Sequence, residues 1–441
     1  MFTSTSGRPH RGLPLWASAT LVGGFVVLLP ASALAGDDHG FGGGHGHKAR
    51  SVIFVNGDGM AAAQREAARL DQEGFDGELA MDALPVAGLQ TTDARDPEDT
   101  VTDSAAGASA WATGVKTYNG AISVDVDGNP LPTLGGEARE AGKATGLVTT
   151  AQVTDATPAA FFSNSTDRSL QDDIARQYLE DTRPSVILGG GEDWWLPAGD
   201  PGAFPDQPEE DPEEGSRSTQ GDLIARAQEQ GYEYVTDAEG LAAAESDLLL
   251  GLFANEEMFQ QRPEGEGDQY DPVVPLADMT TKALDVLSQD RDGFFLLVEE
   301  EAVDEMAHNN NGTRMLEAMR ALDAAVEVAR AYVAEHPDTL LIVTGDHECG
   351  GLTIEDVDPE DESGPGGTLE GVPAAEDETI SGEDGPFLVA GTDKDYALDW
   401  TTTSHTGAPT PVTAEGPDSE ELTGYYPNTH LHEVMHEILV D

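Results

Sequence analysis

Short runs of apolar residues, rich in Val, Ile, Leu and Phe, recur along the chain and predict buried strands. The runs are "SVIFVNG" (51–57), "ATGLVTT" (144–150), "SVILGGG" (185–191), "GFFLLVE" (293–299) and "TLLIVTG" (339–345). They are continuously apolar rather than alternating, which is typical of parallel strands covered on both faces. Segments with helical periodicity lie between them, near 60–71, 276–290 and 315–336. Strands that alternate with helices predict an α/β fold, a three-layer sandwich whose central, mostly parallel sheet is covered by helices on both faces.

The N-terminus has the pattern of a targeting segment. Arg8 and Arg11 precede the apolar run "LPLWASATLVGGFVVLLP", and "ALA" at 33–35 is a small-residue cleavage site. We therefore predict a signal peptide over 1–35 and an exported protein, periplasmic or extracellular, without a membrane anchor after cleavage. Residues 36–49 are rich in Gly and His and predict a linker.

The chain has a large excess of acidic over basic residues. It has 84 acidic and 22 basic residues, a formal net charge of −62. Such a surface repels nucleic acid, so we expect no nucleic-acid binding. An excess of acid can also mean disorder, but the apolar runs argue for a folded protein with an acidic surface, suited to a salt-rich medium. We predict one catalytic domain over 50–441, with acidic surface loops near 200–219 and 355–386.

Metal-ligand residue types stand where several predicted strands end. Asp58 follows the first strand, Glu299 ends another, and Asp346 and His347 follow a third. One such Asp could be a helix cap. Because the carboxyl ends of parallel strands meet at one edge of a sheet, the three endings together predict a metal site.

Further polar residues have both a structural and a functional interpretation. Asp304 and His308 are four residues apart, so on a helix they would share a face and could hold one ion or form an ion pair. His405 lies in a Thr-rich loop, where a histidine is often only solvated. Arg168 could form a surface ion pair, or bind a phosphate group through two hydrogen bonds.

The segment "PEDTVTDSAAGASAWATGVKTYNG" (97–120) places Ser104 among small residues, after Asp103. This crowding is typical of a helix packed tightly against a sheet. It also fits a nucleophile at a helix N-terminus, where free backbone N–H groups attract an anion. The segment alone leaves both alternatives open.

The motifs together resemble those of the bacterial alkaline phosphatases. The strongest match is "VTDSAAGASAWATGVKTYNGAISVD" (101–125), and "VNGDGM", "DATPAA", "GFFLLVE", "VTGDH" and "SHTG" match the other site segments in the same order. The resemblance runs from about residue 50 to the C-terminus. It implies the alkaline phosphatase fold, hydrolysis of phosphate monoesters and a homodimer.

The resemblance also implies a role for each site residue. Ser104 would be the nucleophile that forms a phosphoserine, and Arg168 would hold two phosphate oxygens. Two zinc ions and one magnesium ion are implied, with imidazole and carboxylate ligands for zinc and oxygen ligands for magnesium. The matching ligands are Asp304, His308 and His405 for the first zinc; Asp58, Asp346, His347 and Ser104 for the second; and Asp58, Thr157, Glu299 and, through water, Asp155 for magnesium.

The chain departs from the family pattern in its acidic residues. Glu305 stands where some bacterial relatives carry Lys, and the sequence gives no role for Glu300 and Glu301. Cys349, the only cysteine, follows a zinc-ligand position by two residues, and we predict a packed thiol rather than a ligand.

Other functions remain open from the sequence. A phosphodiesterase, a sulfatase or a metal-dependent mutase can share this fold and metal layout. The sulfatase motif C/S-x-P-x-R is missing from "TDSAAGA", and Arg168 favours a monoester, which has an extra anionic oxygen. Outside enzymes, a secreted metal-binding or phosphate-binding protein would keep some of these residues.

Overall fold

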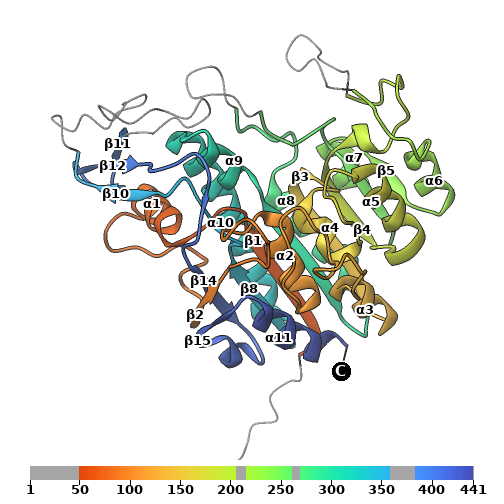
Figure 1. Ribbon diagram of the computed structural model, residues 1–441, viewed down its shortest axis with the longest axis horizontal. Helices are drawn as coiled ribbons and strands as arrows, with labels where there is room; N and C mark the ends of the chain where they lie inside the picture. Colours follow the sequence, from red (N-terminus) through yellow and green to blue (C-terminus); the bar gives the residue numbers. More distant parts are fainter. Residues whose placement is uncertain (1–48, 205–214, 261–268, 358–382, 441) are drawn as a thin grey trace, which may run out of the picture. The chain divides into compact units, whose positions relative to one another are not determined.

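A ten-stranded sheet forms the centre of the computed structural model, in the order β15-β2-β14-β8-β1-β7-β3-β4-β6-β5 (Figure 1). The structure describes residues 49–204, 215–260, 269–357 and 383–440, which belong to the compact unit Gly46–Asp441. Within the sheet, β14 pairs antiparallel with β8 and β2, and the other pairings are parallel. The predicted, mostly parallel sheet is confirmed.

The strands of the large sheet are β1 (Ser51–Gly57), β2 (Val86–Thr91), β3 (Ala144–Gln152), β4 (Val186–Gly190), β5 (Glu233–Val235), β6 (Leu249–Leu252), β7 (Phe294–Glu300), β8 (Thr339–Thr344), β14 (Thr410–Glu415) and β15 (Gly424–Pro427). Two smaller sheets are formed by β10 (Thr353–Glu355), β12 (Asp395–Asp399) and β11 (Glu383–Leu388), and by β13 (His405–Thr406) and β9 (Glu348–Cys349).

The α-helices are α1 (Ala62–Gln72), α2 (Ser104–Thr113), α3 (Leu134–Glu140), α4 (Ala156–Phe162), α5 (Gln171–Gln177), α6 (Leu223–Glu229), α7 (Ala238–Ala243), α8 (Leu276–Leu287), α9 (Ala302–His308), α10 (Gly312–Glu335) and α11 (Thr429–Leu439). Three short turns complete the described elements: the π-helical η1 (Tyr178–Thr182) and the 3₁₀-helical η2 (Glu192–Trp194) and η3 (Ser419–Leu422).

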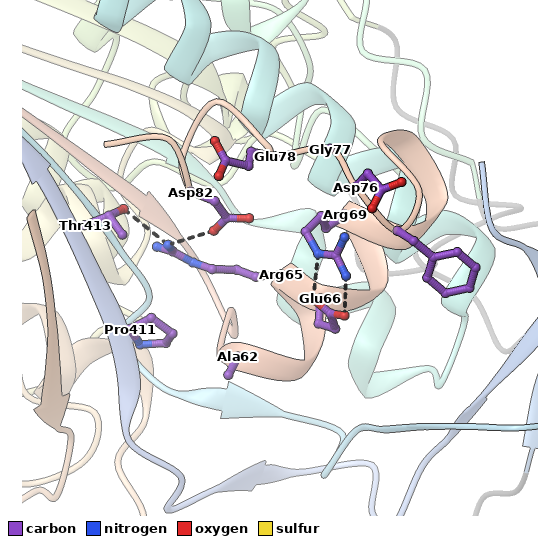
Figure 2. A pocket seen from close by; sticks show the side chains of 11 residues that line it. Ala62, Arg65, Glu66, Arg69, Asp76, Gly77, Glu78, Asp82, Pro411 and Thr413 are labelled. Atoms are coloured by element: carbon purple, nitrogen blue, oxygen red, sulfur yellow. Dashed lines mark hydrogen bonds and ion pairs between the residues drawn. The ribbon is translucent and has the colours of Figure 1, made fainter. Parts of the chain in front are cut away.

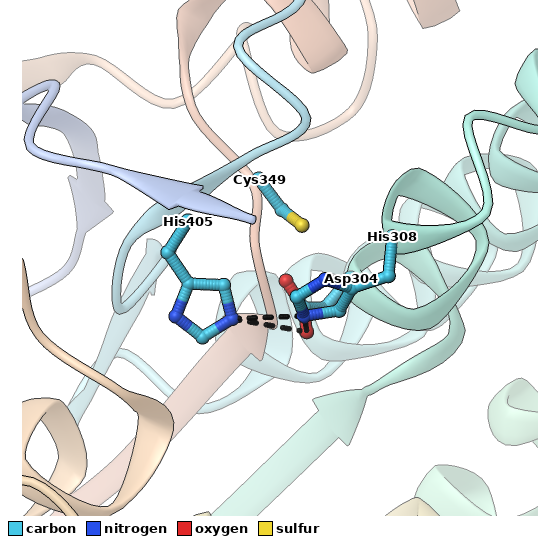
Figure 3. A group of neighbouring side chains, drawn as sticks. All are labelled: Asp304, His308, Cys349 and His405. Carbon is cyan, nitrogen blue, oxygen red and sulfur yellow. Dashed lines mark hydrogen bonds and ion pairs between the residues drawn. The ribbon is translucent and has the colours of Figure 1, made fainter. Parts of the chain in front are cut away.

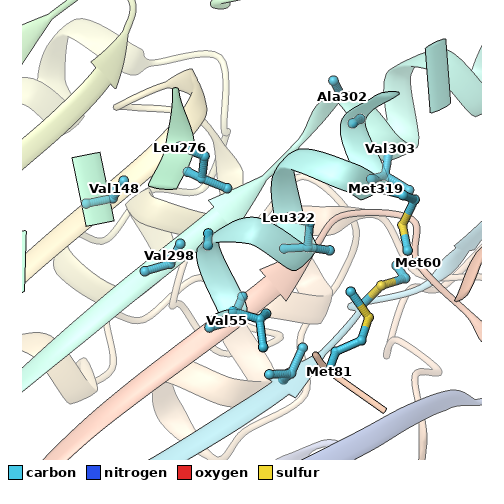
Figure 4. Close-up of a cluster of buried hydrophobic side chains, with 14 of the residues drawn as sticks. Val55, Met60, Met81, Val148, Leu276, Val298, Ala302, Val303, Met319 and Leu322 are labelled. Carbon is cyan, nitrogen blue, oxygen red and sulfur yellow. The ribbon is translucent and has the colours of Figure 1, made fainter. Parts of the chain in front are cut away.

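The sheet separates two hydrophobic cores. Along β1, Ile53 and Val55 belong to the core under α8 and α10, whereas Val52 and Phe54 belong to the core under α2, α3, α4 and α11. Figure 4 shows the first core, where Val55 lies near Leu322 of α10. Because successive side chains of a strand point to opposite faces, continuously apolar strands fill both cores, and the three-layer architecture follows.

The structure fits the pattern of the sequence in most of these elements. The helix predicted near 60–71 is α1, the helix predicted at 276–290 contains α8, and the helix predicted at 315–336 lies almost entirely within α10. The predicted signal peptide, most of the linker and much of both acidic loops lie outside the described residues. The last residues of the loop predicted near 355–386 belong to the strand β11 (Glu383–Leu388). Among the described residues, no helix has the length and apolar character needed to cross a membrane.

Candidate active site

Ser104 is the first residue of α2, at the edge of the sheet where the parallel strands end. Asp103 caps the helix, and its carboxylate accepts hydrogen bonds from the N–H groups of Ala106 (2.9 Å) and Gly120 (2.8 Å). The Ser104 Oγ lies 3.2 Å from His347 Nε2. A Cβ at Gly107 would lie 3.3 Å from the Cβ of Asp346, so the small residues of α2 allow close packing beside this edge. Both interpretations of the Ala/Gly-rich segment therefore hold: the helix is tightly packed, and it presents a serine.

Arg168 lies at the same edge and is held by two carboxylates. One Arg168 nitrogen donates to both carboxylate oxygens of Asp155 (3.0 Å each), and another lies 3.5 Å from Asp103. Burial alone would lower the pKa of Arg168, but Asp155 and Asp103 raise it above its usual range. The guanidinium is therefore charged and is oriented beside Ser104 through the shared contact with Asp103.

A first group of possible metal ligands contains Asp304, His308, His405 and Cys349, whose ligand atoms all lie within 4.8 Å of one another (Figure 3). His308 Nε2 is 3.1 Å from Asp304 Oδ2 and 3.0 Å from His405 Nε2. The other ring nitrogens are fixed by backbone carbonyls, His308 Nδ1 by Thr403 (2.6 Å) and His405 Nδ1 by Thr102 (3.0 Å). These outer contacts leave both Nε2 atoms turned to the same point, as metal-ligating histidines require.

A second group contains Asp58, Asp304 and His347, whose ligand atoms also lie within 4.8 Å of one another. His347 Nε2 is 3.4 Å from Asp58 Oδ1 and 3.3 Å from Asp346 Oδ2. Asp304 belongs to both groups, so the two lie side by side.

Glu299, one of the predicted magnesium ligands, lies near this second group, since its carboxylate repels that of Asp58. In Glu299, one carboxylate oxygen accepts from Asn56 Nδ2 (3.2 Å) and the other from the Thr149 hydroxyl (2.7 Å). Burial raises the pKa of Glu299 to about 7, although hydrogen bonds from Thr149 and Thr157 oppose this, and the carboxylate of Asp155 adds repulsion.

Burial and repulsion between carboxylates dominate the electrostatics of two acids of the site, Asp58 and Asp346. Burial raises the pKa of Asp346 to about 7 and that of Asp58 well above its usual range, and repulsion from Asp304 adds to both shifts. The buried atoms Asp58 Oδ1, Asp346 Oδ2 and His347 Nδ1 have no hydrogen-bond partner. Buried carboxylates are stable when paired or bound to a metal. The carboxylate and imidazole donors therefore fit bound cations at both groups.

Two details differ from the sequence-based interpretation. His405 is part of the two-residue strand β13, which pairs with β9, rather than of a loop. Cys349 is fully buried, as a packed thiol should be, yet Figure 3 shows its sulfur pointing toward Asp304. The pairing of β13 with β9 brings Cys349 opposite His405, a contact between distant segments that the sequence could not show.

Glu300 has a structural role that the sequence did not reveal. Its carboxylate accepts hydrogen bonds from the hydroxyls of Thr150 (2.7 Å) and Tyr270 (2.5 Å) and from the N–H of Ala302 (3.2 Å). It therefore joins β3, the start of α9 and the segment that contains Tyr270.

A pocket of about 550 Å³ lies elsewhere, between α1, the segment after it and β14 (Figure 2). Arg65 is buried there, near Thr413 and Asp82, and Arg69 pairs with Glu66. None of the sequence-predicted site residues lines this pocket.

Comparison with known proteins identifies the family. The family model "Alkaline phosphatase" matches residues 49–370. The chain is 36% identical to streptomycin-6-phosphate phosphatase of Streptomyces griseus, over 96% of each chain. It is 32% identical to the alkaline phosphatase of Escherichia coli K12, over 88% of this chain and 85% of that one.

Solved structures agree with the sequence matches. The alkaline phosphatase of Thermus thermophilus superposes with a TM-score of 0.71 at 27% identity, over 90% of this chain and 92% of that one. The alkaline phosphatase of the Antarctic bacterium TAB5 gives a TM-score of 0.69 at 25% identity, over 89% and 98%. With a serine, an arginine and buried carboxylate and imidazole ligands at one sheet edge, the chain belongs to the alkaline phosphatase family and is a metal-binding hydrolase of phosphate monoesters.

Proposed function

We propose that the chain hydrolyses phosphate monoesters through a phosphoserine at Ser104, with two zinc ions and one magnesium ion. The observation that carries this proposal is the position of the Ser104 Oγ at the start of α2, 3.2 Å from His347 Nε2. His347 also belongs to the second group of possible ligands. A serine hydroxyl needs activation to act as a nucleophile, and a metal ion bound beside His347 would supply it.

The ligand sets divide as the family resemblance implies. Asp304, His308 and His405 would hold the first zinc ion, and Asp58, Asp346, His347 and Ser104 the second. Asp58, Thr157 and Glu299 would hold magnesium, with Asp155 acting through water. When bound, the metal ions would lower the pKa of the nucleophiles and stabilise the leaving oxygen. Cys349 remains outside this set, because three protein ligands leave the open position that a catalytic zinc needs.

The protein groups then have defined tasks. The Ser104 oxygen attacks phosphorus, and the bond from phosphorus to the leaving alcohol breaks. Arg168 donates two hydrogen bonds to phosphoryl oxygens, and the N-terminus of α2 adds its dipole. Water then attacks the phosphoserine, which releases inorganic phosphate and restores the hydroxyl. This in-line exchange depends on positioning and electrostatics.

The proposed substrates are phosphate monoesters, and the alcohol part of the ester can vary. The Streptomyces griseus relative is named for its action on streptomycin-6-phosphate, so we include streptomycin-6-phosphate among the candidate substrates. A phosphodiesterase is the alternative, and Arg168 argues against it because a diester has one anionic oxygen fewer. Export, cleavage of residues 1–35 and a homodimer remain predictions.

Phosphate labelling of the enzyme tests the nucleophile. After a brief reaction with a labelled monoester and an acid quench, label is expected on the peptide that contains Ser104. Ser104→Ala should lose the label and nearly all turnover but keep its metal ions, counted by elemental analysis. Label on another residue would contradict the proposal.

A further inference from the structure

Two short strands lie beside residues of both proposed zinc sites. The strand β9 begins with Glu348, directly after His347, and β13 consists of His405 and Thr406. In their antiparallel pairing, Glu348 is opposite Thr406 and Cys349 is opposite His405. The rings of His347 and His405 are stacked, with their centroids 3.6 Å apart. Two residues of pairing are too few to fix this arrangement by themselves, so side-chain contacts must contribute.

The Glu348 carboxylate is the centre of these contacts. The residue is 4% exposed, and both of its carboxylate oxygens accept hydrogen bonds. Its Oε2 accepts from the Thr406 hydroxyl and from the Gly351 N–H (3.2 Å). Its Oε1 accepts from the Leu352 N–H (2.9 Å) and from Gln64 Nε2 (3.0 Å). Glu348 therefore joins the turn that follows it to both β13 and α1.

Gln64 connects this carboxylate to the backbone of α1 and β9. It is fully buried, and its Nε2 donates to Glu348 and to the Cys349 carbonyl (2.8 Å). Its Oε1 accepts from the N–H of Ala61 (3.0 Å), at the start of α1. Only one orientation of the amide satisfies these partners, because the two oxygens accept and the N–H donates. Gln64, Glu348 and Thr406 are called here the Glu348 network.

A backbone hydrogen bond extends the contacts around β9 toward His405. The N–H of Gly350 donates to the Ser404 carbonyl (3.1 Å), directly before His405, and Thr406 follows directly after it. The backbone of His405 is therefore held on both sides, while its ring is oriented by the Thr102 carbonyl. Loss of the Thr406 contact would loosen the backbone of a proposed zinc ligand without removing the ligand.

Glu348 is placed to position ligands rather than to bind a metal ion. Among the described residues, neither group of ligand atoms within 4.8 Å of one another includes it. Its carboxylate accepts four hydrogen bonds, about as many as a carboxylate can accept. Outer contacts around a metal site orient the ligands, and their loss typically lowers metal affinity by about 10–100-fold.

We propose that Glu348 is a positioning residue, which together with Gln64 and Thr406 sets the relative positions of His347 and His405 and thereby the zinc affinity of the site. This inference rests on the proposed function. It adds to the proposed ligands three side chains that touch neither substrate nor metal ion.

Thr406→Val tests the network with little change in side-chain shape, because a methyl group replaces the hydroxyl. In competition with a chelator, one zinc ion per chain should bind at least about tenfold more weakly than in wild type. Thr406→Ser keeps a hydroxyl and should bind zinc as tightly as wild type does. At saturating zinc, Thr406→Val should recover most of its turnover, because the ligands themselves are intact.

Glu348→Gln gives a second measurement of the same network. The variant turns an NH₂ group toward donors that the carboxylate now satisfies, so it should weaken zinc binding at least as much as Thr406→Val. The double variant should bind zinc no more weakly than Glu348→Gln alone, because both changes remove the same contact.

Asp323→Asn is the matched control. Asp323 is a buried acid of α10 that accepts from the N–H groups of Ala80 and Met81 (2.9 Å each). Its replacement should lower the melting temperature and leave the zinc affinity unchanged.

The same measurements separate this inference from the proposed function. If Thr406→Val and Glu348→Gln lower the melting temperature but bind zinc as tightly as wild type, the network only stabilises the fold; the inference is then wrong and the proposed function stands. Additive losses of zinc affinity in the double variant would also contradict it, because the two side chains would then act independently. If wild type binds zinc but forms no phosphoserine at Ser104, the proposed function fails and the zinc affinities still decide on the network. If wild type binds no zinc, both fail.

Discussion

Arg168 stands between two carboxylates, and this arrangement determines what its removal should do. The guanidinium is oriented by Asp155 and lies near Asp103, so it is positioned before substrate arrives. Charge-assisted hydrogen bonds contribute roughly 1.5–3 kcal/mol each. Arg168→Ala should therefore reduce kcat/KM for monoesters by at least tenfold, weaken inhibition by phosphate, and affect diesters less. Steady-state kinetics on both substrate classes checks this.

Arg168→Lys is the matched control, because it keeps the charge but cannot make two parallel hydrogen bonds. We expect it to fall between wild type and Arg168→Ala on monoesters. Equal losses of both variants on monoesters and diesters would show that Arg168 acts only through overall charge.

Cys349 lies close enough to the first group of possible ligands to raise the question of whether it binds zinc. Its thiol lies within 4.8 Å of the ligand atoms of Asp304, His308 and His405. Burial and the carboxylate of Asp304 raise the pKa of Cys349 well above its usual range, which favours a thiol over the thiolate that zinc binds. We expect Cys349→Ala to keep its full zinc content. Loss of one zinc ion per chain, measured by elemental analysis, would make Cys349 a ligand, and Cys349→Ser would serve as the variant of equal size.

The N-cap of α2 contributes to both the stability of the helix and the position of Arg168. The Asp103 carboxylate accepts from two backbone N–H groups and lies 3.5 Å from Arg168. Loss of an N-cap typically costs about 1 kcal/mol. Asp103→Ala should lower the melting temperature and slow turnover, because both the helix start and Arg168 lose a partner.

Asp103→Asn separates the two effects, since the amide oxygen can still cap the helix but carries no charge. We expect its melting temperature to lie close to that of wild type while its phosphate affinity changes. A melting temperature as low as that of Asp103→Ala would mean that the charge, rather than the cap, stabilises this element.

Asp58, Glu299 and Asp346 were predictable as neighbours because each stands at or just after the end of a continuously apolar strand, and the ends of parallel strands share one edge. The shared face of Asp304 and His308 followed from their spacing only if the segment was helical, and α9 meets that condition. The contact of Glu348 with Gln64 was not predictable, because it joins β9 to α1, which are far apart in the chain. Cys349 was missed as a neighbour of His405 because the two-residue pairing of β9 with β13 has no periodic signal.

For the whole molecule, the net charge of −62 sets an electrostatic condition on folding. Like charges repel within a Debye length, which is about 30 Å at 0.01 M salt and about 3 Å at 1 M. The stability margin of a folded protein is only about 5–15 kcal/mol. Long-range repulsion can therefore reduce the free energy of unfolding substantially in dilute buffer and very little in concentrated salt.

We accordingly expect the melting temperature to rise from dilute buffer to molar salt, with metal ions saturating throughout, because the buried ligand carboxylates also need counter-charge. The acids near 200–219 and 355–386 are dense in sequence, and none of the proposed ligands is among them. Replacing about a dozen of them by Asn or Gln should flatten the salt dependence while zinc content and turnover stay the same. If the melting temperature of wild type is level across this range, the acidic surface is not an adaptation to salt. If the replacements do not change how steeply the melting temperature rises with salt concentration, the repulsion arises around the buried acids of the site. The salt dependence of the melting temperature should then change with the number of metal ions bound.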